Sequence, residues 1–127
     1  MKITLAKLVP AMVSGALWRL HRLDLPVRMS YEFNKFMEAA RKEGAAHDDG
    51  RLRLLKKHGT PIEGTQDQFK LVDAEAYNRE LDELLAIEVT LPDSPITLAA
   101  VLSAKDGTLH AEDWNLLAPF IEGVIVK

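Results

Sequence analysis

The 127-residue sequence contains no cysteine and no apolar run close to the roughly 20 residues that a membrane-spanning helix needs. The absence of cysteine excludes disulfides, thiolate nucleophiles and every cysteine-based zinc site. The first residues carry Lys2 and Lys7 but no compact apolar stretch followed by a small-residue cleavage site, so we do not predict a signal peptide. Together these absences predict a protein of the cytoplasm with no membrane partner.

Catalytic motifs are also missing. The sequence has no nucleophile elbow, phosphate-binding glycine loop, HExxH pair or EF-hand loop. Carboxylates gather at 80–88, but Glu80 and Glu83 alternate with leucines in the pattern of an exposed helix face. The adjacent polar residues 47–49 do not converge on one ion when they lie on a helix. We therefore expect no enzyme activity, no cofactor and no metal.

Charge is distributed unevenly in a chain whose length suits a single domain, 1–127. The net charge is −3, but residues 1–58 carry +6 and residues 59–127 carry −9. Such asymmetry marks either a polyanion-binding face or two halves that fold against each other. We favour the second interpretation, because the basic residues are spread along helices among Glu and Asp. The net acidity argues against a dedicated DNA-binding protein.

Helical spacing of apolar residues begins at Leu5 and continues to Leu23. Thr4 stands at the N-cap position, and Pro10 removes an amide donor, so the helix should start or kink at Pro10. We predict a helix from residue 6 or 9 to 22. Because apolar residues occupy more than one of its faces, it should be mostly buried.

A second helix is predicted to begin after Pro26, since proline suits the first helical turn. One apolar stripe follows, made of Val27, Tyr31, Phe33, Phe36, Met37 and Ala40. Weak helix formers at 44–50 could interrupt it. We favour one long helix that ends at Gly59 after the cations of 56–58. The short connection should make the two long helices an antiparallel hairpin.

The acidic half is expected to form the α/β part of an α+β, mostly helical fold. We predict a loop over 60–68 and strands over 69–72 and 87–91 that pair antiparallel. Helices are predicted over 74–86 and 111–117, with a helical turn near 99–103 between them. A turn is predicted at 105–107, and the apolar tail should dock on the domain. Asp73 should cap the helix that follows it. The sequence ITLA at 3–6 recurs at 96–99, which favours two threonine-capped transitions from strand to helix that could pair in one small sheet.

Arginines and one tryptophan are the candidates for an interaction surface. Trp18 beside Arg19 is an aromatic and arginine pair of the kind that anchors interfaces. The alternative, which we favour, packs Trp18 in the core and pairs the arginines with the acidic half. If the surface binds a protein, we expect the contacts to come from Trp18, Arg19, Arg22, Arg28, Arg51 and Arg53.

Several segments occur in a characteristic order. They are MKITL at the start, Leu25-Pro26 before a long aromatic-bearing helix, KKHG at 56–59, ELDELLAIEV at 80–89 and LLAPFI at 116–121. This order resembles a family of small uncharacterised proteins encoded by tailed bacteriophages and prophages. The resemblance implies a phage origin. None of the matching segments is a catalytic motif, so it assigns no functional residues.

The function that we favour is a non-enzymatic phage accessory protein that binds and modulates another protein, a host factor or a defence component, in the host cytoplasm. One alternative is a virion or assembly component, such as a connector, tail or chaperone subunit, which predicts a homo-oligomer formed through the helical hairpin. Another is a nucleic-acid-binding regulator, whose affinity would fall steeply with salt.

Overall fold

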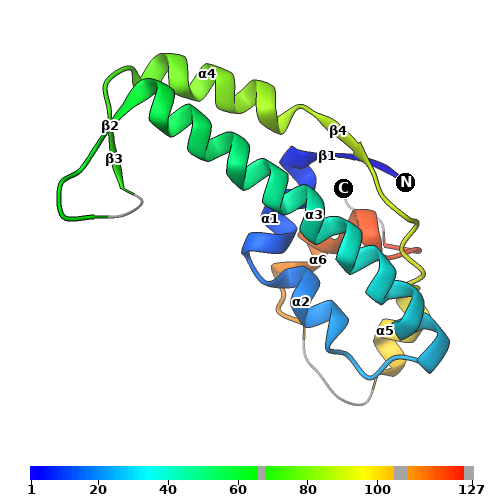
Figure 1. The fold of residues 1–127 in the computed structure, drawn as a ribbon. Helices are drawn as coiled ribbons and strands as arrows, with labels where there is room; N and C mark the ends of the chain where they lie inside the picture. Colours follow the sequence, from blue (N-terminus) through cyan, green and yellow to red (C-terminus); the bar gives the residue numbers. More distant parts are fainter. Residues whose placement is uncertain (66–67, 105–108, 125–127) are drawn as a thin grey trace.

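The protein is a mostly helical α+β fold built around one long helix (Figure 1). The computed structural model describes residues 1–65, 68–104 and 109–124. Helix α3 (Val27–His58) is 32 residues long and runs along most of the molecule. It continues through 44–50 without a break, as favoured from the sequence. Packing of other helices along it outweighs the weak helix propensity of that stretch.

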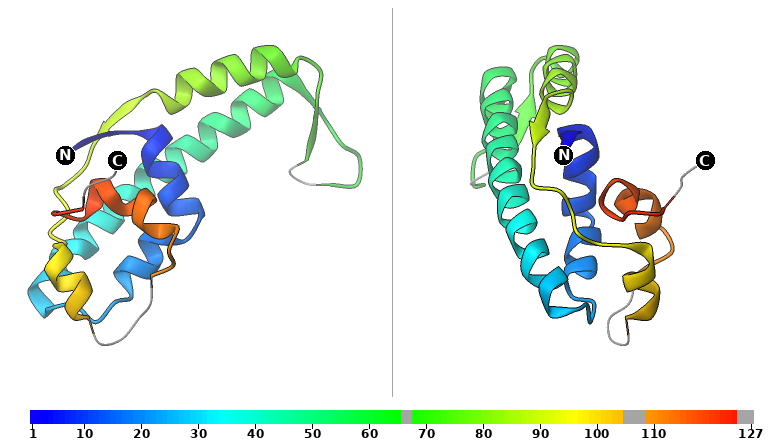
Figure 2. Two further views of the ribbon diagram at one scale, coloured as in Figure 1. Left: turned by 180° about the vertical axis from the view of Figure 1, so that it is seen from behind. Right: turned by 90° about the vertical axis from the view of Figure 1, so that its right-hand side faces the viewer.

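The other helices form layers against α3. Helices α1 (Leu5–Val13) and α2 (Ala16–His21) pack on it, and α4 (Ala74–Leu85) returns antiparallel to its C-terminal half. Figure 2 shows α1 and α2 between α3 and the segment that contains α5 (Leu98–Ser103) and α6 (Asp113–Leu117). The predicted first helix, present as α1 and α2, packs on α3, and α3 forms a second, longer antiparallel hairpin with α4 that the sequence did not predict.

The first predicted helix is divided in two at Gly15. This glycine has φ +84°, in the left-handed region that side chains with a Cβ rarely adopt. The turn redirects the chain, so α1 and α2 each bury a separate apolar face against the core. Helix α1 starts at Leu5 and contains Pro10, so the alternative in which the helix starts at Pro10 is wrong.

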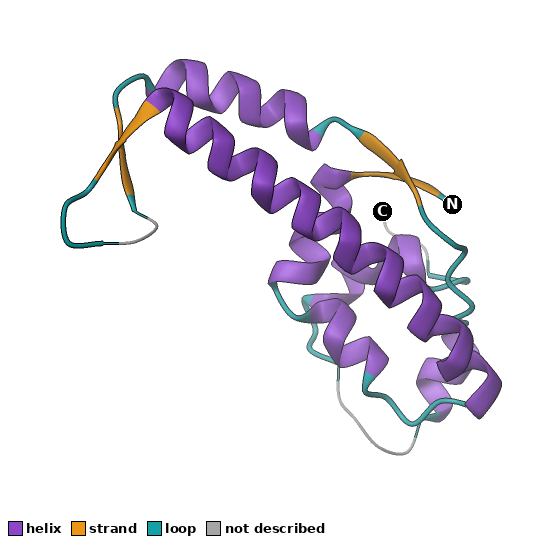
Figure 3. Cartoon of the chain, viewed as in Figure 1, coloured by secondary structure: helices purple, strands orange, loops and turns teal. Residues whose placement is uncertain are grey.

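The two short sheets contain strand pairings that were not predicted from the sequence (Figure 3). Strand β1 (Lys2–Thr4) pairs antiparallel with β4 (Glu88–Thr90), and Ile3 lies opposite Val89 with both side chains buried. Strand β2 (Gly59–Pro61) pairs with β3 (Phe69–Leu71) instead. The prediction that 69–72 pairs with 87–91 is therefore wrong, although both strands exist.

Residues 60 and 61, expected to belong to a loop over 60–68, lie in strand β2 instead. Gly59 also differs from the helix-capping glycine that was predicted. Gly59 has extended backbone rather than the left-handed conformation of a helix cap. A Cβ at this position would lie 2.7 Å from the carbonyl oxygen of Leu55 and 3.1 Å from that of Lys70. The close approach of the β2–β3 hairpin to the end of α3 therefore requires glycine.

The predicted caps are confirmed at Asp73 and Thr97. The Asp73 carboxylate accepts a 3.0 Å hydrogen bond from the Ala76 N–H, and the Thr97 hydroxyl accepts one of 3.2 Å from the Ala100 N–H. Thr4 occupies the N-cap of α1 without a side-chain hydrogen bond. The two ITLA segments do not pair, because Thr97 forms a parallel bridge with Glu122.

Helix α6 is followed by a short 3₁₀ helix, η1 (Ala118–Phe120). The predicted helix over 111–117 is confirmed with a later start. The turn predicted at 105–107 and most of the apolar tail, 125–127, lie outside the described residues.

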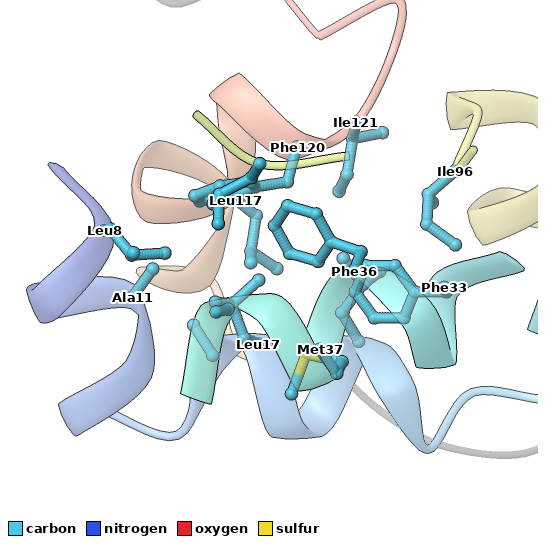
Figure 4. Close-up of a cluster of buried hydrophobic side chains, with 14 of the residues drawn as sticks. Leu8, Ala11, Leu17, Phe33, Phe36, Met37, Ile96, Leu117, Phe120 and Ile121 are labelled. Carbon is cyan, nitrogen blue, oxygen red and sulfur yellow. The ribbon is translucent and has the colours of Figure 1, made fainter. Parts of the chain in front are cut away.

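The core lies against the N-terminal half of α3, where α1, α2, α6 and η1 meet (Figure 4). Phe36 is at its centre, with its ring stacked on Phe33 at 5.3 Å and edge-on to Phe120 at 5.5 Å between centroids. The largest of the fully buried side chains are Leu8, Leu17, Leu20, Phe33, Phe36, Ile96, Leu117, Phe120 and the polar Asp113. The outer ends of α3 and α4 and the β2–β3 hairpin project away from this core.

Candidate protein-binding surface

Trp18 lies on the surface of α2, and the interpretation that placed it in the core is wrong. Its neighbours Leu17 and Leu20 are buried, whereas Trp18 is 52% exposed. The guanidinium carbon of Arg22 lies 5.8 Å from the centre of the indole, and the His21 ring lies 5.9 Å from it on the same helix. A cation held against an aromatic face stabilises both side chains. The indole is therefore exposed in a defined orientation.

His21 connects this indole to α3. Its Nε2–H donates to Oδ1 of Asn34 over 2.5 Å, and its ring packs on Phe33. Asn34 shares one face of α3 with Tyr31 and Val27, since residues three, four and seven apart align on a helix. Val27 is 87% exposed and Tyr31 is 59% exposed. We call the group formed by Trp18, His21, Arg22, Val27, Tyr31 and Asn34 the Trp18 surface.

The apolar stripe predicted on α3 is thus correct only in part. Phe33, Phe36, Met37 and Ala40 are buried as expected, but Val27 and Tyr31 are not. Both lie in the first turns of α3, on its face away from the buried stripe. The amine of Lys35 lies 4.8 Å from the centre of the Tyr31 ring, which adds a second cation and aromatic pair to this face.

Arg19 does not belong to the surface, because it forms an internal ion pair with Asp113. Its Nε–H and Nη2–H donate to the two carboxylate oxygens over 2.7 and 2.6 Å, and the Asp113 side chain is fully buried. The Arg19 guanidinium lowers the pKa of Asp113. Burial acts against this effect, and the 2.8 Å hydrogen bond from the His110 N–H supports it. This pair joins the basic half of the chain to the acidic half.

The remaining arginines divide between the two ends of α3. Arg28 is exposed beside Val27, next to the Trp18 surface. Arg51 and Arg53 are exposed too, but Arg51 lies about 35 Å from Arg28 along the axis, at a rise of about 1.5 Å per residue. The six residues expected at an interface therefore form no single surface.

Glu80 joins the middle of α4 to the C-terminal end of α3. Lys57 donates to Oε1 of Glu80 over 2.7 Å, and the His58 imidazole contacts Oε2. These two hydrogen bonds lower the pKa of Glu80 to about 2. Because the folded-state value is below the ordinary 4.5, the ion pair contributes to stability above that pH, and the contribution disappears as the pH falls towards 2. An ionised carboxylate is unsuited to act as a general acid.

Other kinds of site find no support in the described part of the chain. There, His, Asp and Glu side chains form no group of three that could hold a metal ion. Within 1–65, 68–104 and 109–124, no helix has the length and apolar character needed to cross a bilayer. Comparison of the chain with models of known protein families, with curated proteins and with solved structures found no match.

Proposed function

We propose that this chain is a non-enzymatic accessory protein that binds and modulates another protein, and that the partner docks on the Trp18 surface. The observation that carries the proposal is the oriented indole of Trp18, exposed beside Arg22. Trp, Tyr and Arg are the residue types that dominate binding energy in protein interfaces. Because neighbouring side chains already hold the indole, docking costs little conformational entropy.

The charges around the surface define the kind of partner that it fits. Arg22 lies against Trp18 and Lys35 against Tyr31, so each aromatic face is accompanied by a positive charge. Exposed Arg28 adds a third cation at the start of α3. A partner with apolar side chains at the centre of its interface and acidic side chains around them would complement this arrangement.

The sequence resemblance suggests where that partner is found. Small phage-encoded proteins act in the cytoplasm of an infected bacterium, so we propose a host factor or a defence component as the partner. A virion or assembly role would instead bring phage structural proteins onto the same surface. Identification of the captured partner distinguishes this role from binding to a host or defence protein.

Trp18→Ala is expected to weaken partner binding by about 2 kcal/mol or more, roughly 30-fold, because it removes a central aromatic contact. Affinity capture from infected-cell lysate with the tagged wild-type protein, followed by mass spectrometry, identifies the partner. Titration of the purified partner against the wild type and Trp18→Ala then measures the change.

Charge reversal provides a matched control. Arg22→Glu should reduce capture, whereas Arg51→Glu makes the same change at the distant end of α3 and should leave capture unaltered. Capture that survives both Trp18→Ala and Arg22→Glu would refute the proposed surface. Recovery of capsid or tail proteins in place of a host protein would favour the virion role.

A further inference from the structure

An open groove of about 370 Å³ runs between α3 and α4, where the two helices lie side by side away from the core (Figures 1 and 2). Its apolar lining includes Leu54 and Leu84, which are half-buried, and Ile87, which is 48% exposed. A Cβ on Gly50 would lie 3.2 Å from the Leu84 side chain, so the helices approach closely here. The apolar side chains of a two-helix layer stay accessible until another element packs on them.

The charged residues of the groove divide by sign between its two helices. Arg53 lies on α3, whereas Glu80 and Glu83 lie on α4. Glu80 is already paired with Lys57 and His58. Arg53 and Glu83 are exposed, and neither forms an ion pair with another described residue. Within the described part of the chain, the groove therefore has an unpaired cation on its α3 rim and an unpaired anion on its α4 rim.

Arg53 and Glu83 lie at about the same level along the hairpin. The ion pair of Lys57 with Glu80 sets the register of the two antiparallel helices. Arg53 is four residues before Lys57 and Glu83 is three residues after Glu80, so both lie about 5 Å closer to the core than this pair. A two-fold axis parallel to the groove keeps this level and exchanges the two rims. It therefore places Arg53 of each copy opposite Glu83 of the other.

We propose that a second copy of this chain packs on the α3–α4 groove around this two-fold axis, with reciprocal ion pairs between Arg53 and Glu83. The groove is complementary in charge to itself in this orientation, which selects a second copy as its occupant. Helix α3 of one copy then lies antiparallel to α4 of the other, as in an up-and-down four-helix bundle. Leu54, Leu84 and Ile87 of both copies meet at the centre of the bundle.

The size of this face determines the strength of the dimer. Helix α4 has 12 residues and is about 18 Å long, so the face is smaller than the roughly 800 Å² that each partner buries in a standard interface. We therefore expect a weak dimer, with a dissociation constant on the order of 10⁻⁵ M. The face lies at the opposite end of α3 from the Trp18 surface, so dimerisation does not depend on the partner proposed above.

Sedimentation velocity of the intact protein over a range of micromolar concentrations tests the proposal. The wild type should pass from monomer to dimer as its concentration rises. Arg53→Glu and Glu83→Arg each place like charges opposite each other at two points, so each should weaken dimerisation about tenfold or more. Both positions are exposed, and circular dichroism checks that each variant stays folded. An equal mixture of the two variants should dimerise again, because each then presents opposite charges to both rims of the other.

Arg51→Glu is the matched control. It makes the same change of charge two residues away, and residues two apart do not share a helix face, so dimerisation should be unchanged. A wild type that dimerises equally well with either reversal, or a mixture that stays monomeric, would overturn the proposal. A wild type that stays monomeric would overturn it too, and loss of partner capture in Arg53→Glu would then assign the groove to a different protein.

Discussion

Replacement of Phe36 by alanine is expected to lower the free energy of unfolding by about 4 kcal/mol, the middle of the range for truncation of a buried phenylalanine. Phe36 is fully buried and contacts the rings of Phe33 and Phe120, so its removal separates α3 from η1. The cavity cannot close easily, because the surrounding side chains come from several helices. Urea denaturation followed by far-ultraviolet circular dichroism measures the change.

Tyr31→Ala is the matched control, since it removes an exposed aromatic ring from the same helix. A surface substitution of this kind should change stability by no more than about 0.5 kcal/mol. If Phe36→Ala costs as little as Tyr31→Ala, the core described here is wrong.

Asp113→Ala is expected to destabilise the protein by about 3 kcal/mol, because removal of one partner breaks a buried ion pair. For a domain of this size the melting temperature should fall by about 10 °C. Asp93→Ala is the control, because Asp93 pairs with the N-terminal amine at 2.9 Å but is 89% exposed, and exposed pairs contribute little.

The effect of Asp113 also has a defined dependence on pH. Its pKa is lowered in the folded protein below the ordinary value of 3.8, so its contribution is fully present above that value and is lost as the pH falls through the folded-state pKa. The stabilities of the wild type and Asp113→Ala should therefore converge on acidification from pH 7. A difference that grows as the pH falls would contradict a stabilising ion pair.

Elements set by local pattern could be predicted from the sequence. Helix α3 carries Phe33, Phe36, Met37 and Ala40 at helical spacing, and Asp73 and Thr97 each precede a helix that they cap. Strand pairing was not predictable in the same way. The strand ending at Thr4 and the strand near Val89 have similar alternation to several others, and only the packing of α1 and α4 brings them together.

The binding surface required the tertiary structure for a similar reason. Trp18 and Arg19 are adjacent, yet α6 covers Arg19 through Asp113 and leaves Trp18 exposed. No local sequence signal indicates that Trp18 is exposed and Arg19 is covered. Val27 and Tyr31 are apolar, but the helical period places them away from the buried face of α3, and both remain exposed.

Hydroxyl-radical footprinting of the protein with and without its captured partner tests the location of the binding surface most directly. Trp18 and Tyr31 are exposed and reactive, while Ile62 and Val72 are exposed near the β2–β3 hairpin at the other end of the molecule. Docking on the Trp18 surface predicts that the partner protects Trp18 and Tyr31 from oxidation and leaves Ile62 and Val72 unchanged. Protection confined to Ile62 and Val72 would contradict it.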